Sequence, residues 1–148
     1  MVDVSRKPTT ARVAIARAAI RMRRETLALI EANQIAKGDV LTLAQVAGVM
    51  AAKRTADLIP LCHPLPLTDI QVRITTDRAA GGVVVETQAQ TVARTGVEME
   101  ALVAAAVAAL TVYDMCKAHD RDMTIERVRL VHKRGGRSGI YTRSGENP

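Results

Sequence analysis

The sequence predicts an α+β fold in which helices cover one face of an antiparallel sheet, and three observations lead to this prediction. Residues 69–76, DIQVRITT, alternate apolar and polar side chains as a half-buried strand does. The pair Gly81-Gly82 then predicts a tight reversal into a second strand at 83–92. A long, mostly apolar helix from about 96 to 118 and a last strand at 123–132 complete a β-β-α-β unit.

The first half of the chain decides whether the sheet has three strands or four. After an irregular arm at 1–11, the segment 12–24 is ambiguous, because its alanines favour a helix while apolar and polar residues alternate over part of it. Helices are expected at 25–33 and, with Asp39 as N-cap, up to about residue 54. We expect a strand at 12–23, because four strands make a better sheet. The order β-α-β-β-α-β is that of the split βαβ, or ferredoxin-like, sandwich.

Composition is consistent with a single domain over residues 1–148, ending in a flexible, basic, glycine-rich tail at 134–148. The chain has no Phe or Trp and only two Tyr, so its core must be built from small aliphatic side chains and Met. Such side chains bury less area per residue. Other subunits could therefore supply part of the burial.

A net charge of +6 favours anionic partners such as phosphates, nucleic acid or an acidic surface. Cys62 and Cys116 form no metal-ligand spacing and no disulfide framework, which is typical of a reducing cytoplasm. No metal or redox cofactor is signalled, and no Walker or GxGxxG motif is present. The longest apolar run, 101–110, is too short for a membrane span, which requires about 18 residues.

The most unusual stretch is 58–67, LIPLCHPLPL, whose three prolines exclude a helix and predict stiff, extended backbone. It carries Cys62 and His63. Because adjacent residues of an extended chain point to opposite faces, these two should not act as a nucleophile and its base. The thiol is better explained as a small buried hydrophobe. His63 is the better candidate, for phosphate binding or proton transfer near pH 7, although it could simply be packed.

Further candidates lie on helices and in basic loops. Asp114 and Lys117 share one side of the long helix near its end, as either a solvated ion pair or part of a site. Lys37 precedes a helix start, where backbone donors suit an anion, but could be an ordinary loop lysine. Lys53 could serve only the dipole of the helix it ends. The basic, glycine-rich segment 133–139 could grip phosphate or could simply be mobile.

Six stretches in order resemble the cyclic pyranopterin monophosphate synthase family, molybdenum cofactor biosynthesis protein C. They are MVDVSRK at 1–7, KGDVL at 37–41, AAKRTADLIPLCHPLPL at 51–67, TGVEMEAL at 95–102, LTVYDMCKA at 110–118 and KRGGRSG at 133–139. The resemblance implies a lyase that converts 3',8-cyclo-7,8-dihydro-GTP into cyclic pyranopterin monophosphate and releases pyrophosphate, the second step of molybdopterin synthesis. It also implies a ferredoxin-like subunit in a homohexamer, a trimer of dimers, and so favours the strand at 12–23.

The resemblance also assigns roles to residues. It places the essential aspartate and lysine on Asp114 and Lys117, and puts Lys37 and His63 with them in the catalytic set. The implied substrate-binding positions are Leu61, Cys62, His63, Met99, Glu100, Lys7, Lys53, Lys133 and Arg137. Arg137 replaces a family lysine, and because arginine is a poor proton donor it is assigned phosphate binding only. We expect Lys37 and Lys117 to act as general acid and base, with Asp114 orienting Lys117.

Helix geometry suggests how these residues are combined. Glu100 and Asp114 lie fourteen positions apart on one helix, which is roughly 21 Å at about 1.5 Å per residue. One compact substrate could hardly touch both in the same chain. We therefore expect each site to be shared between subunits, with Asp114 and Lys117 from one chain and His63, Met99 and Glu100 from another.

Two other functions compete with this one. A basic β-α-β-β-α-β domain is also the plan of an RNA-recognition module, but such modules stack bases on strand aromatics that this chain lacks. A purely structural oligomer subunit is the third possibility, and it predicts that Asp114→Ala and Lys117→Ala leave function intact. The enzyme reading predicts a small-molecule substrate, with neither nucleic acid nor a membrane as partner.

Overall fold

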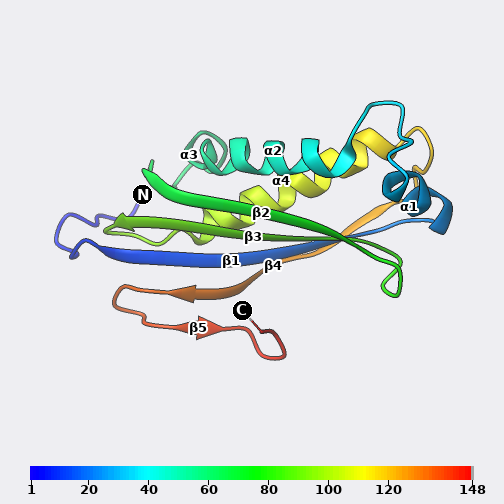
Figure 1. Ribbon diagram of the computed structural model, residues 1–148. Coiled ribbons are helices and arrows are strands. Elements are labelled where there is room, and N and C mark those ends of the chain that lie inside the picture. Colours follow the sequence, from blue (N-terminus) through cyan, green and yellow to red (C-terminus); the bar gives the residue numbers. More distant parts are fainter. Residues whose placement is uncertain (148) are drawn as a thin grey trace.

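A computed structural model describes residues 1–147 and shows a mixed α+β arrangement with helices on one face of an antiparallel sheet (Figure 1). The five strands lie in the order β2-β3-β1-β4-β5. The elements are β1 (Thr10–Arg21), α1 (Arg24–Glu31), α2 (Val40–Ala52), α3 (Thr55–Leu58), β2 (Leu67–Asp77), β3 (Gly82–Ala93), α4 (Glu98–Cys116), β4 (Thr124–Arg134) and β5 (Tyr141–Thr142).

The ambiguous first segment is a strand, as expected, and β1 occupies the middle of the sheet. It pairs antiparallel with β3 on one side and with β4 on the other. The alternating alanines explain why: Ala14, Ala16 and Ala18 are fully buried on the face that the helices cover. Tertiary packing against α4 therefore overrides the helix propensity of alanine.

Small side chains allow α4 and α2 to pack unusually close to their neighbours. On β3, the Thr87 hydroxyl donates a 2.7 Å hydrogen bond to the backbone carbonyl of Ala101 in α4. In α2, a Cβ added to Gly48 would lie 3.2 Å from the carbonyl oxygen of Ala104 and 3.1 Å from Val72. The core expected from the lack of Phe and Trp is thus a layer of Ala, Val, Ile, Leu and Met between helices and sheet.

Helix α4 is long and apolar enough by length and composition to cross a membrane, although the uninterrupted apolar run in the sequence is shorter. Here it packs on β1, β3 and β4 and against α2, and its mostly buried alanines belong to the core. The core helix of a folded domain passes the same test of length and composition. Leu110 is an exception to the expected burial, with 56% of its surface exposed.

Two expectations need correction, and one element was not expected. The second helix ends at Ala52, and a separate turn of helix, α3, follows it. The stretch 58–67 is not extended throughout, because Leu58 lies in α3 and the chain then turns, with the Cys62 N–H donating to the Ile59 carbonyl at 3.0 Å. Beyond residue 134 the chain adds a short strand that was not expected, β5, which pairs with β4.

Candidate functional site

The first group of predicted residues meets where α4 ends. Asp114 lies in the last turn of α4, and its carboxylate forms two ion pairs. Lys37 Nζ, from the turn before α2, lies 2.7 Å from Asp114 Oδ2, and Lys117 Nζ lies 2.7 Å from Asp114 Oδ1. Lys37 Nζ also donates to the Asp114 backbone carbonyl at 3.0 Å. We call these three residues the carboxylate–lysine cluster.

The electrostatics of this cluster bear on what its groups can do. Hydrogen bonds from Lys117 and then from Lys37 lower the pKa of Asp114 to about 2, so the carboxylate is ionised at any physiological pH. The same contact raises the pKa of Lys117, because its ammonium is stabilised by Asp114. All three side chains are about half exposed, so the cluster is open to a ligand.

The second group meets at the other end of α4, beside the proline-rich stretch. A hollow of about 300 Å³ is bordered there by Leu61, Cys62, His63, Met99, Glu100 and Lys7 among others. The stretch is fixed at its far end, where the Thr91 hydroxyl donates to the Pro66 carbonyl at 2.6 Å. Cys62 and His63 border the same hollow. The turn at 59–62 interrupts the extended chain on which their expected separation onto opposite faces was based.

Burial sets the protonation of two groups in this hollow. Glu100 is only 4% exposed, and desolvation raises its pKa. Desolvation, together with the nearby Glu100 carboxylate, also raises the pKa of the Cys62 thiol. A thiol with a raised pKa is a poor nucleophile. Cys62 is half-buried rather than fully buried, and it lines the hollow.

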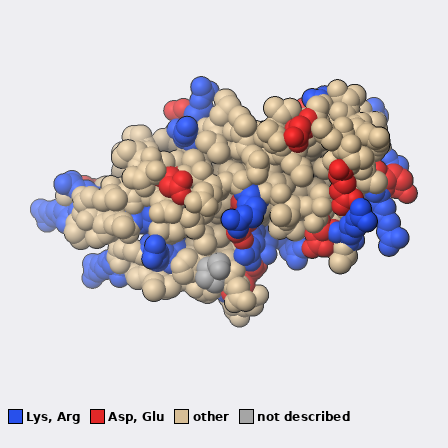
Figure 2. Space-filling model, in the orientation of Figure 1, with Lys and Arg blue, Asp and Glu red and all other residues tan. Residues whose placement is uncertain are grey.

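A larger basic hollow of about 920 Å³ adjoins the second group and shares Lys7 with it. It also contains Lys133 and Arg137 from the β4–β5 connection, together with Arg6, Arg12 and Arg94. Lys and Arg side chains gather at this end of the molecule, on the left of the view in Figure 2. The positive charge suits a ligand with several phosphates.

Arg12 is a residue that our reading of the sequence missed. It is the third residue of β1, is only 9% exposed, and lines the basic hollow. Within residues 1–147 its guanidinium makes one hydrogen bond, a long one of 3.5 Å from Nη2 to the Arg94 carbonyl, and its buried Nε has no partner. Thr10 Oγ1, at the same hollow, is also buried and finds no partner in the described part of the chain. A buried guanidinium left this way indicates a place for an anion.

The two groups lie at opposite ends of α4, as the ribbon view shows (Figure 1). Met99 and Glu100 are in its first turn, whereas Asp114 is in its last. Lys53 follows α2 and borders neither of the two hollows. A single chain therefore brings Lys37 to Asp114 and Lys117, and separately brings His63 to Met99 and Glu100, but it does not join the two groups.

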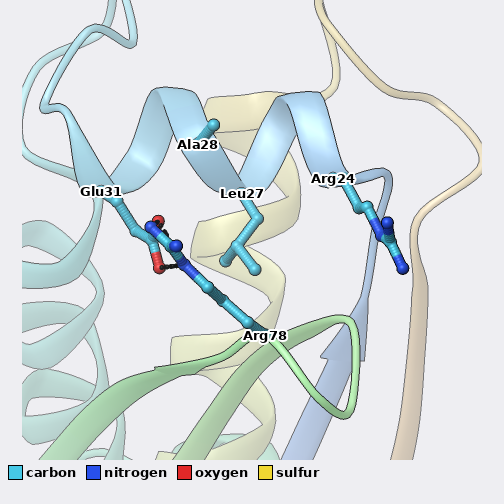
Figure 3. Close-up of a pocket in the computed structure, with 5 residues that line it drawn as sticks. All are labelled: Arg24, Leu27, Ala28, Glu31 and Arg78. Carbon is cyan, nitrogen blue, oxygen red and sulfur yellow. Dashed lines mark hydrogen bonds and ion pairs between the residues drawn. The ribbon is translucent and has the colours of Figure 1, made fainter.

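A third hollow, of about 420 Å³, contains none of the predicted site residues. It lies between α1 and the β2–β3 turn, where Glu31 and Arg78 form an ion pair across it at 2.6 Å and Arg24 points away (Figure 3). Leu27 forms its apolar wall. Within residues 1–147 no group of three or more His, Cys, Asp or Glu side chains is placed to hold a metal ion.

Comparison with known proteins gives one consistent result. The model of the MoaC family matches residues 1–136. A protein of Thermomicrobium roseum named cyclic pyranopterin monophosphate synthase is 59% identical over 146 residues, which cover 99% of this chain and 88% of the relative. Proteins of the same name from Cereibacter sphaeroides (58% identity; 97% and 91% covered) and Heliobacterium modesticaldum (55%; 97% and 90%) are similarly close.

Proposed function

This chain belongs to the MoaC family, and we propose that it catalyses the reaction after which its relatives are named, as a cyclic pyranopterin monophosphate synthase in molybdenum cofactor biosynthesis. Its substrate is 3',8-cyclo-7,8-dihydro-GTP, and pyrophosphate is released as the cyclic phosphate closes. The single observation that carries the proposal is the pairing of one carboxylate with two lysines, and the basic hollow at the other end of α4 supports it.

The carboxylate–lysine cluster supplies the proton transfers. Asp114 holds both ammonium groups at 2.7 Å, which supports its proposed role of orienting Lys117. A general base must be unprotonated, yet the contact with Asp114 raises the pKa of Lys117. We therefore assign Lys117 the role of proton donor. We assign the role of general base to Lys37. It takes this role after the substrate and neighbouring cations have separated it from Asp114.

The basic hollow and its neighbour bind the substrate. Lys7, Lys133 and Arg137 are placed to neutralise the triphosphate, and the buried Arg12 joins them. The adjoining hollow is assigned to bind the rest of the substrate. It is bordered by Leu61, Cys62, His63, Met99 and Glu100. Lys53 is the predicted binding residue with the weakest support, because it borders neither hollow.

The two groups form one site only if a second subunit brings them together. We propose that Asp114 and Lys117 of one chain face the His63 hollow of another, within a homohexamer built as a trimer of dimers. The outer face of α2 supports an interface, because Leu43, Val46 and Met50 recur at helical spacing and are 46–55% exposed. Leu110 on the adjacent helix is exposed too.

Three finer assignments belong to this proposal. The order β2-β3-β1-β4 of the four long strands, with the helices on one face, supports a ferredoxin-like single domain over residues 1–148. The two unpaired cysteines are compatible with a cytoplasmic location. The RNA-binding alternative gains no support from the strands: Tyr113 lies on α4, and Tyr141 is in the two-residue β5.

The direct test is to incubate the purified protein with 3',8-cyclo-7,8-dihydro-GTP and to measure pyrophosphate and the pterin product. Both should appear in equal amounts. A folded protein that yields neither would defeat the proposal. If it instead bound unstructured RNA more tightly than nucleoside triphosphates, with a strong dependence on salt, the RNA-binding function would replace it.

A further inference from the structure

Two arginines lie directly opposite each other on the open face of the sheet, away from the helices. Arg17 of β1 and Arg129 of β4 are register partners. Like charges at opposed positions of neighbouring strands repel each other. The Glu146 carboxylate lies between them: Arg17 Nη1 is 2.7 Å from Glu146 Oε2, and Arg129 binds the other oxygen, Oε1. All three side chains are largely buried, with exposed fractions of 14–23%.

Glu146 belongs to the last residues of the chain, and further contacts hold this segment down. The Arg143 N–H donates to the Val131 carbonyl at 2.8 Å, and its Nε donates to the Leu130 carbonyl. The Asn147 carbonyl accepts a hydrogen bond from Arg17 Nη2 at 2.9 Å. By contrast, strand β5 itself pairs with β4 through only two residues. Most of the anchoring therefore comes from the side chains around Glu146 and Arg143.

The segment held down through Arg143 and Glu146 helps to fix the loop 135–140. This loop carries Arg137 and follows Lys133. The loop begins where β4 ends and returns through β5, so its two ends are fixed by β4 and by the segment after β5. Its start is pressed against β1. A Cβ on Gly135 would lie 2.2 Å from the Ala11 carbonyl oxygen, and one on Gly136 would overlap the Arg12 guanidinium. Lys133 also contacts the Ser138 hydroxyl.

We propose that Glu146 is a positioning residue for phosphate binding. By joining Arg17 to Arg129 it fixes the return of the chain after β5, and so holds Arg137 and Lys133 at the basic hollow against Arg12. Glu146 touches no substrate in this account. Its effect on the reaction rests on the proposed function, whereas its effect on the loop does not.

Glu146→Gln and Glu86→Gln make a matched pair of variants. Glu86 also pairs with Arg17 on the open face, at 2.6 Å, but it lies on β3 and its side chain makes no direct ion pair or hydrogen bond with residues 135–147. Hydrogen exchange of the loop amides at 135–140 is measured first, since it needs no activity. We expect exchange to be faster by roughly tenfold in Glu146→Gln and little changed in Glu86→Gln, with exchange in α4 unaltered in both.

Steady-state kinetics then separate binding from chemistry. Because misplaced binding groups cost about tenfold or more, KM should rise by roughly tenfold in Glu146→Gln. We expect kcat to stay close to that of the unsubstituted protein, because the ion pairs of Glu146 hold a binding loop and involve no member of the carboxylate–lysine cluster within residues 1–147. The charge-conserving Glu146→Asp should bring KM part of the way back to the value of the unsubstituted protein.

Equal loop exchange in the two Gln variants, or a fall in kcat with unchanged KM, would overturn the inference. If the unsubstituted protein itself released no pyrophosphate, the proposed function would be contradicted. The hydrogen-exchange result alone would then decide whether Glu146 positions the loop.

Discussion

Lys37 Nζ lies 2.7 Å from Asp114 Oδ2, although the two residues are 77 positions apart in the chain. The contact joins the turn before α2 to the last turn of α4. Asp114 in turn holds Lys117, three residues further along the chain, at the same distance. A carboxylate between two ammonium groups stays ionised and keeps Lys117 protonated, which suits proton donation rather than proton abstraction.

Removing any member of the carboxylate–lysine cluster should abolish most of the activity. For Lys117→Ala, Lys37→Ala and Asp114→Asn we expect kcat to fall by roughly 10²- to 10⁴-fold, the range typical of general acid–base catalysis. Arg121→Gln is the control, because this exposed side chain lies in the same region outside the cluster. Pyrophosphate release measures the effect. Full activity in Asp114→Asn would instead favour a purely structural role for the cluster.

The titration of Asp114 tests the electrostatics independently of catalysis. Its pKa is lowered from 3.8 to about 2, so the ion pairs contribute stability above pH 4 that is lost as the pH falls through 2. Lys117 behaves oppositely: its pKa is raised, and its contribution disappears only at strongly alkaline pH. Carbon-13 NMR of the Asp114 carboxyl should give a midpoint near 2. Lys117→Ala should raise that midpoint more than Lys37→Ala, and a reversed order would contradict the assigned causes.

Arg12 should be part of the triphosphate site. Hydrogen bonds to charged groups contribute about 1.5–3 kcal/mol, so Arg12→Gln should weaken the binding of inorganic triphosphate by at least about tenfold. Isothermal titration calorimetry at fixed salt measures the affinity. Arg54→Gln serves as the control, because Arg54 is exposed and borders neither hollow. Equal affinities in the two variants would show that the Arg12 guanidinium binds no phosphate.

Asp120 should matter for stability rather than for catalysis. This carboxylate is 2% exposed and accepts hydrogen bonds from the backbone N–H of Arg23 at 2.8 Å and of Asp122 at 3.2 Å. Burial alone raises its pKa, but these contacts outweigh burial and the pKa is lowered. Asp120→Ala leaves both donors unpaired, and we expect a loss of about 3 kcal/mol of unfolding free energy.

Urea denaturation at fixed protein concentration measures this loss, since oligomerisation couples stability to concentration. The exposed Asp122→Ala, whose carboxylate makes no hydrogen bond within residues 1–147, should change stability by less than about 0.5 kcal/mol. Because the pKa of Asp120 is lowered, its contribution is present above pH 4 and is lost on acidification. Equal stabilities of the two variants would contradict the role of Asp120.

Most of the fold follows from local pattern. The alternation in 69–76, the Gly81-Gly82 turn and the Asp39 N-cap each correspond to an observed element, and Asp39 accepts the Thr42 N–H at 3.0 Å. Helix α3 and strand β5 could not be predicted this way. They have four and two residues, and they exist because of tertiary contacts at their ends rather than any periodicity of their own.

The site is a harder problem for sequence analysis. Asp114 and Lys117 are neighbours on one helix, so their contact follows from spacing alone. The contact of Lys37 with Asp114 depends on how α2 packs across α4, and no local sequence pattern specifies that packing. Arg12 carried a usable signal, because it shares the buried face of β1 with Ala14 and Ala16, where a charged residue is unusual.

The proposed site is completed by two subunits, and mixed oligomers test this most directly. Lys117→Ala and His63→Ala subunits, each inactive alone, are mixed under conditions in which subunit exchange is demonstrated by mass spectrometry. If Lys117 and His63 of one site come from different chains, a random equal mixture contains about one intact site in four. The account predicts roughly a quarter of the unsubstituted activity. Exchanged oligomers that release no more pyrophosphate than the separate variants would contradict the shared site.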